Sequence, residues 1–129
     1  MKKRAAAKAV NEFFVYRADR KDEFRILSPE QPEGDCEDYA LTVLDYISNH
    51  KFKKLKRRLR KGKAELVFCI DPFGQKHNIL KYGKKTYIDN QLKRWVSLDE
   101  LLELGYRNLK TQPWRWVLGK LRRTPQNNR

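Results

Sequence analysis

Residues 28–34 constrain the fold most, because this stretch (Ser-Pro-Glu-Gln-Pro-Glu-Gly) holds two prolines and one glycine in seven positions. An irregular connection is therefore predicted here, and a helix is predicted to begin directly after it. Asp35 suits the N-cap, and Asp38, at the third helical position, can return the hydrogen bond of a capping box. The apolar residues between Tyr39 and Ile47 supply a broad apolar face, which indicates a helix central to the fold.

Three short runs in the second half of the chain have the composition of β-strands: residues 64–70, 76–82 and 86–89. Asp71-Pro72-Phe73-Gly74 fits a type I turn between the first two runs, since aspartate stands first, proline second and glycine fourth. Gly83-Lys84-Lys85 joins the second run to the third. The runs predict an antiparallel meander and, together with the preceding helix, an α+β fold.

The length of 129 residues allows one domain, and 40% apolar residues are enough for a compact core. We predict that domain over residues 1–122, with further helices over 5–16 and from a capping box at 97–100, and a basic flexible tail over 123–129. No stretch of 18 apolar residues is present, and a lysine interrupts the N-terminal alanines before a secretory core forms. We therefore expect a soluble cytoplasmic protein with no membrane partner and with reduced cysteines.

The formal net charge of +14 is unevenly distributed. Residues 12–45 hold ten acidic and four basic side chains, whereas nine of the thirteen residues from 51 to 63 are basic. Phe52, Leu55 and Leu59 recur in this basic stretch at spacings of three and four, which predicts an amphipathic basic helix or an exposed hairpin arm. Such an arm can bind nucleic acid or an acidic protein. The candidate polyanion-binding residues are Lys53, Lys54, Lys56, Arg57, Arg58 and Arg60.

Cys36 is the candidate nucleophile, because it lies in the first turn of the predicted central helix. Unpaired backbone N–H groups and the positive end of the helix dipole favour the thiolate at that position. The neighbouring carboxylates of Asp35, Glu37 and Asp38 act in the opposite direction. Position alone therefore does not lower the pKa of the thiol, and a histidine must help. The other cysteine, Cys69, lies inside an apolar strand-like run and is expected to serve packing.

The sequence contains two histidines. His50 lies 14 residues after Cys36, at the far end of the same predicted helix. At a rise of about 1.5 Å per residue it would be roughly 20 Å from the thiol, too far to activate it. His77, in the second strand-like run, is therefore the candidate base, and Asp89, in the third run, is its candidate partner.

The loop over residues 83–85 decides whether His77 and Asp89 share a face of the sheet. A three-residue loop pairs Tyr82 with Thr86, and the two candidates then become diagonal neighbours about 7–8 Å apart at the backbone. A two-residue loop would put them on opposite faces. We predict the three-residue loop, its five-residue equivalent or a compensating bulge.

Three motifs carry a resemblance to a known family. They are Gly34-Asp35-Cys36-Glu37-Asp38-Tyr39-Ala40-Leu41, His77 with the following Ile79-Leu80, and Ile88-Asp89-Asn90. Together they resemble the bacterial transglutaminase-like cysteine proteinase family, over roughly residues 10–98. The resemblance implies a small papain-like, transglutaminase-like fold in which a nucleophile helix packs on an antiparallel sheet.

The resemblance also implies a mechanism, nucleophilic acyl transfer on a protein or peptide amide by a Cys36-His77-Asp89 triad. His77 would accept the thiol proton and Asp89 would hold the imidazole in its productive tautomer. The backbone N–H of Cys36 can contribute to an oxyanion hole, with Gln31 as a candidate side-chain donor. Peptide hydrolysis is the favoured outcome, and cross-linking or deamidation by a transglutaminase-type enzyme remains an alternative.

Calcium is the one cofactor that the resemblance implies, and the reaction itself requires none. In a calcium-dependent branch of the family, carboxylates flanking the cysteine bind the ion, and Asp35, Glu37 and Asp38 match those positions. The same carboxylates can merely cap the helix, and for a protein that is not exported we favour the cap. A second alternative concerns function: a nucleic-acid-binding module on a degenerate proteinase scaffold would use the basic arm and leave Cys36 unreactive.

Overall fold

The computed structural model describes residues 1–18 and 23–126. Its helices are α1 (Lys3–Phe13), α2 (Cys36–Ile47), α3 (Phe52–Arg60), α4 (Leu98–Glu103) and α5 (Trp114–Arg123). Its strands are β1 (Val15–Tyr16), β2 (Glu33–Gly34), β3 (Ala64–Ile70), β4 (Lys76–Tyr82), β5 (Thr86–Ile88), β6 (Val96–Ser97) and β7 (Arg107–Thr111). The predicted α+β class is confirmed.

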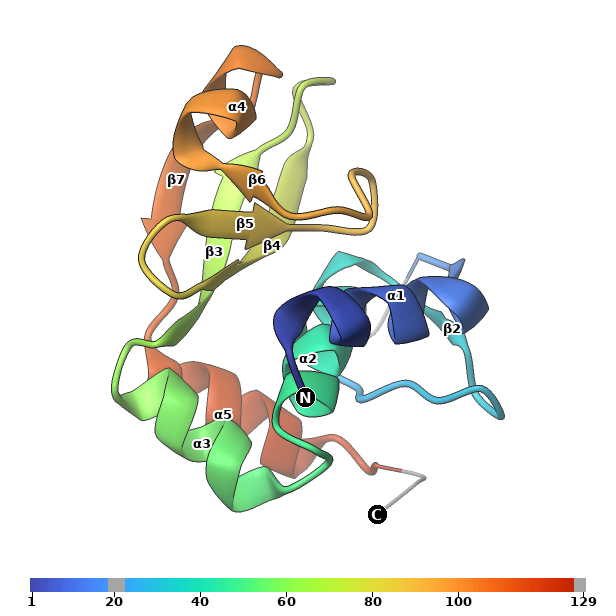
Figure 1. The fold of residues 1–129 in the computed structure, drawn as a ribbon. Coiled ribbons are helices and arrows are strands. Elements are labelled where there is room, and N and C mark those ends of the chain that lie inside the picture. Colours follow the sequence, from blue (N-terminus) through green and yellow to red (C-terminus); the bar gives the residue numbers. More distant parts are fainter. Residues whose placement is uncertain (19–22, 127–129) are drawn as a thin grey trace.

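A curled sheet of five antiparallel strands forms one half of the molecule, in the order β6-β5-β4-β3-β7. Figure 1 shows this sheet with α4 in one half and the other four helices gathered in the other half. The short strands β1 and β2 pair in parallel and bring the segment after α1 beside the start of α2. This pairing places Tyr16 opposite Gly34, two residues before α2 begins at Cys36.

Two hydrophobic clusters cover the two faces of the sheet. The larger cluster packs α1, α2, α3 and α5 against one face, which contributes Leu66, Leu80 and Ile88. The smaller cluster packs Leu101 of α4 and Tyr106 against the other face. Strand residues alternate between the two clusters because successive side chains in a strand point to opposite faces. Both faces of β3 and β4 therefore carry buried residues.

The predicted register of the central hairpin is confirmed. Tyr82 pairs with Thr86 and Leu80 with Ile88, so the loop over 83–85 has three residues. The predicted turn at 71–74 also forms, with Gly74 N–H donating to the Asp71 carbonyl at 2.9 Å. The basic stretch takes the helical alternative, since α3 buries Leu55 and Leu59.

Two predicted boundaries differ from the structure. The first helix ends at Phe13 rather than at residue 16, because Val15 and Tyr16 pair with β2 instead. The packed part of the chain extends past residue 122, since the Thr124 hydroxyl accepts the Phe24 N–H and Gln126 bonds to Phe24 and Ile26. The rest of the predicted tail, residues 127–129, lies outside the described residues. None of the described helices has the length and apolar character needed to cross a membrane.

Candidate active site

Cys36 is the first residue of α2, and a complete capping box fixes it there. Asp35 Oδ1 accepts the N–H of Asp38 at 3.3 Å, and Asp38 Oδ2 accepts the N–H of Asp35 at 3.2 Å. Asp38 Oδ1 accepts the N–H of Arg25 at 2.8 Å, so the cap also holds the preceding segment. At Gly34 an added Cβ would lie 2.8 Å from Asp38 Oδ2, which only glycine avoids. The sequence before Cys36 therefore sets the position of the thiol closely.

His77 and Asp89 are in direct contact on one face of the sheet. His77 Nε2 lies 2.7 Å from Asp89 Oδ2, although His77 is in β4 and Asp89 directly follows β5, twelve positions later. His77 is 5% exposed and Asp89 is fully buried. Nε2 is engaged with the carboxylate, which leaves Nδ1 as the imidazole nitrogen that can accept a proton. The structure thus places the side chains of His77 and Asp89 in direct contact.

Asp89 is held by more than His77. Its Oδ1 accepts the backbone N–H groups of Gln91 at 3.1 Å and Leu92 at 2.7 Å. Its Oδ2 accepts the hydroxyl proton of Tyr106 at 2.6 Å. These interactions satisfy a buried carboxylate, which would otherwise be expensive to place in the core.

Cys36 and His77 line one cavity of about 380 Å³ at the junction of α2 and β4. The Sγ atom of Cys36 lies 3.6 Å from Glu37 Oε2 and 3.9 Å from Asn78 Nδ2. Among the described residues no hydrogen bond joins Cys36 to His77. The structure thus brings the nucleophile and the candidate base to the same cavity, with the thiol resting against Asn78.

The pKa of the Cys36 thiol lies far above its ordinary value, because burial disfavours the thiolate and the carboxylates of Glu37 and Asp35 repel it. Hydrogen bonds from Asn78 act in the opposite direction. Burial and the neighbouring Asp35 raise the pKa of Glu37 to about 9 and that of Asp38 to about 8. Burial and the neighbouring carboxylates therefore favour the neutral thiol over the thiolate, so nucleophilic attack by Cys36 would need a base to take its proton.

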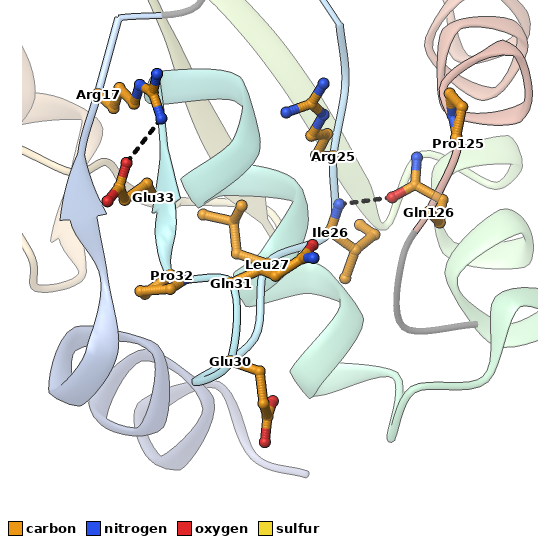
Figure 2. A pocket seen from close by; sticks show the side chains of 10 residues that line it. All are labelled: Arg17, Arg25, Ile26, Leu27, Glu30, Gln31, Pro32, Glu33, Pro125 and Gln126. Atoms are coloured by element: carbon orange, nitrogen blue, oxygen red, sulfur yellow. Dashed lines mark hydrogen bonds and ion pairs between the residues drawn. The ribbon is translucent and has the colours of Figure 1, made fainter.

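Gln31 is not brought to the thiol. It is exposed in a turn in which residues 28 and 31 bond to each other, and it lines a different cavity. Figure 2 shows that cavity, in which Arg17 pairs with Glu33 at 3.0 Å. Although Gln31 is only five residues before Cys36, it lines a cavity that Cys36 does not line. The predicted oxyanion role of Gln31 has no geometric support.

The carboxylates at the positions matched to calcium ligands lie around the start of α2, and their oxygen atoms suit that ion. Asp35 and Asp38 already accept backbone N–H groups as the helix cap. Within residues 1–18 and 23–126, no group of three or more His, Cys, Asp or Glu side chains is arranged to hold a metal ion. Asp35 and Asp38 therefore serve as the helix cap, whereas Glu37 Oε2 lies 3.6 Å from Cys36 Sγ.

The candidate polyanion-binding residues lie on α3. Lys54, Arg57 and Arg58 line a shallow cavity of about 230 Å³ together with Lys61 and Lys63. The other candidates on this helix, Lys53, Lys56 and Arg60, lie outside that lining. The arm predicted from the sequence is therefore a helix packed on the body of the protein by its leucines.

Sequence reasoning missed three polar residues around the site: Tyr106, Asn78 and Gln112. Tyr106 lies 17 residues after Asp89, and no local pattern links the two. Asn78 is next to His77 in β4 but its role depends on how the sheet curls against α2. Gln112 follows β7, a strand whose basic, largely exposed sequence lacks the alternation that indicates a strand.

Comparison with known proteins shows what this arrangement resembles. A scan against protein-family models finds no match, and a search of curated proteins finds none either. Solved structures of LapG from Legionella pneumophila do match: one LapG chain at TM-score 0.57 and 18% identity, over 92% of this chain and 75% of that one.

The calcium-bound form of LapG matches at TM-score 0.53 and 17% identity, and the EGTA-treated form at 0.51 and 18%. Both matches cover 84% of this chain, which spans only 62% and 60% of those two chains. Identities this low support the fold and leave the chemistry to the residues of the site. The chain therefore has a fold similar to the transglutaminase-like fold of LapG.

Proposed function

We propose that this protein is a thiol-dependent acyl-transfer enzyme, and specifically a cysteine peptidase that acts on a protein or peptide amide. One observation carries the proposal: His77, which contacts the buried carboxylate of Asp89, lines the cavity that Cys36 also lines at the start of α2. The three residues come from the start of α2, from β4 and from the position directly after β5. The LapG-like fold is consistent with this chemistry.

The reaction would begin with proton transfer from Cys36 to Nδ1 of His77, since Nε2 faces Asp89. The sulfur then forms a bond to the amide carbon, and the carbonyl electron pair moves to oxygen. Collapse of this adduct breaks the C–N bond, and the amine leaves with the proton that His77 returns. Water, activated by the same imidazole, then hydrolyses the thioester and restores the thiol. No step passes through a metal ion.

Asp89 would orient the imidazole and stabilise its cationic form. Its buried position and its bonds to Tyr106, Gln91 and Leu92 hold the carboxylate oxygens in place. The raised pKa of Cys36 makes this help necessary, because the isolated thiol would stay protonated near neutral pH.

Alkylation by iodoacetamide tests the proposal, with labelled sites identified by mass spectrometry. We expect selective modification of Cys36 at pH 7, and His77→Ala should slow it at least about tenfold because the base is removed. Cys69→Ala is the matched control and should leave the rate unchanged, since Cys69 is fully buried in the smaller cluster. Equal rates for the wild type and the His77 variant would contradict the proposal.

The product chemistry is tested with a Cys36→Ala variant used to trap protein substrates, followed by turnover of a trapped protein by the wild type. New N-termini in that protein would indicate peptide hydrolysis. Glutamate in place of glutamine would indicate deamidation, and covalent linkage to added cadaverine would indicate transglutaminase chemistry.

A second candidate function is binding of nucleic acid by α3. The supporting observation is the cavity lined by five basic side chains and no acidic one among the described residues. Fluorescence anisotropy with a labelled 20-base-pair duplex tests this, and the Kd should rise steeply with salt because bound counterions are released. Lys54→Glu with Arg57→Glu should weaken binding at least about tenfold. Lys8→Glu with Lys93→Glu, the same change of charge on another face, is the control.

A further inference from the structure

The oxyanion of the proposed acyl transfer needs donors close to the nucleophile. The N–H of Cys36 is the first in α2 and has no acceptor within the helix, and it donates to no described residue. A single backbone donor is usually joined by a second one. Gln31, the side-chain donor expected from the sequence, lines a different cavity.

Asn78 is the side-chain donor that the fold brings to this place. Its Nδ2 lies 3.9 Å from Cys36 Sγ, and both residues line the same cavity. The oxyanion forms on the carbon that bonds to Sγ, so a donor already beside the sulfur is within reach of that oxygen. Donors in such sites lie about 3 Å from the oxyanion.

Gln112 fixes the direction in which the Asn78 amide points. Gln112 Nε2 donates to Asn78 Oδ1, which turns the Nδ2 donor of Asn78 toward the sulfur. The backbone N–H of Gln112 donates to the Leu66 carbonyl at 2.9 Å and ties this residue to β3. The amide of Asn78 is therefore oriented before any substrate arrives.

We propose that Asn78 is the side-chain oxyanion donor of this protein, acting with the backbone N–H of Cys36, and that Gln112 is its positioning residue. The inference rests on the proposed acyl transfer. In the adduct, the sulfur-carbon bond forms while the carbonyl electron pair becomes an oxyanion, and Nδ2 donates to that oxygen. When the adduct collapses, the pair returns to the carbon and the leaving group departs.

The test compares two reagents that both need the Cys36 thiolate. 4-Nitrophenyl acetate reacts through a tetrahedral oxyanion and releases a burst of nitrophenolate. Iodoacetamide reacts by direct displacement, in which the sulfur bonds to the methylene carbon and iodide leaves, and no oxyanion forms. Asn78→Ala should lower the acylation rate constant at least about tenfold relative to the alkylation rate constant, because loss of one oxyanion donor costs about 10²–10³ in other enzymes. Because Asn78 also bonds to the sulfur, the ratio of the two constants is the decisive quantity.

Gln112→Ala should change the same ratio in the same direction by a smaller factor, about threefold, with the apparent affinity for the ester unchanged. It keeps the inference testable if the Asn78 variant does not fold. Lys76→Ala is the matched control, because Lys76 is exposed on the same strand and lines the same cavity. Its ratio should equal that of the wild type.

Three outcomes would overturn the inference. An unchanged ratio in a folded Asn78→Ala variant would show that the amide does not stabilise the oxyanion. A change in the Lys76 control equal to that in the Asn78 variant would show an unspecific effect of the cavity wall. A wild-type protein with neither a Cys36-dependent burst nor selective alkylation would overturn the proposed function itself, which distinguishes the two failures.

Discussion

The Tyr106 hydroxyl donates to Asp89 Oδ2 at 2.6 Å, the same oxygen that lies 2.7 Å from His77 Nε2. The Oδ2 atom of Asp89 therefore contacts two groups, the neutral hydroxyl of Tyr106 and the imidazole of His77. Burial and the carboxylate of Asp89 raise the pKa of Tyr106 well above its ordinary value, so the hydroxyl keeps its proton and always acts as a donor.

Tyr106→Phe should remove this donor while keeping the ring in the smaller cluster. We expect a loss of about 1 kcal/mol in the free energy of unfolding, measured by urea denaturation. The rate of alkylation of Cys36 should fall several-fold, because the carboxylate is less firmly held. Tyr87→Phe is the control in the same cluster and should change neither quantity.

Asp89→Ala should be severely destabilising. It leaves the N–H groups of Gln91 and Leu92 and the Tyr106 hydroxyl without their acceptor in a buried place. A loss of at least about 3 kcal/mol in unfolding free energy is expected. Asp89→Asn should cost less, because Oδ1 can still accept both N–H groups. Equal losses for the two variants would contradict this account.

Glu37→Gln should change how stability depends on pH. The pKa of Glu37 is about 9 in the folded protein against an ordinary value of 4.5, so the folded state binds this proton more tightly than the unfolded state. Its contribution to stability is complete below about pH 4.5 and is lost as the pH rises to about 9. The glutamine variant lacks this loss. Its advantage in unfolding free energy over the wild type should therefore grow from pH 5 to pH 9, and a constant difference would contradict the assignment.

Gly34→Ala should disturb the cap before Cys36. The new Cβ would lie 2.8 Å from Asp38 Oδ2 and from Leu27 Cδ1, so we expect a loss of about 1–3 kcal/mol. Gly119→Ala in α5 is the matched control substitution, and it should change the free energy of unfolding in the opposite direction. The nearest atom to its Cβ would be 3.5 Å away, and an alanine there should stabilise the helix by about 0.5–1 kcal/mol. Thermal unfolding of both variants checks the two signs.

Local signals were enough to predict α2, the three central strands and the hairpin register. Asp35 and Asp38, three residues apart, bond to each other's backbone N–H groups as a capping box. The length of the loop over 83–85 fixes which residues pair across the hairpin. For the same reason the contact of His77 with Asp89 was predictable.

The remaining parts of the site depend on contacts between distant segments. Strand β7 is mostly exposed and basic, and it became a strand only because it pairs with β3. Asn78 contacts the thiol because the curled sheet meets α2. Gln112 contacts Asn78 because it follows β7, which pairs with β3. Proximity along the chain favoured Gln31 as a donor, whereas the path of the chain takes it away from Cys36.

The two hydrophobic clusters divide the reacting groups between them. Cys36 begins a helix of the larger cluster, whereas His77 and Asp89 contact Tyr106 of the smaller one. The proposed reactivity would therefore depend on how α2, packed on one face of the sheet, is aligned with the groups packed on the other face. At urea concentrations below the unfolding transition, the alkylation rate of Cys36 should decline before the helical circular dichroism signal does. In a protein built in this way, a slight misalignment would remove the proposed reactivity and leave every helix and strand in place.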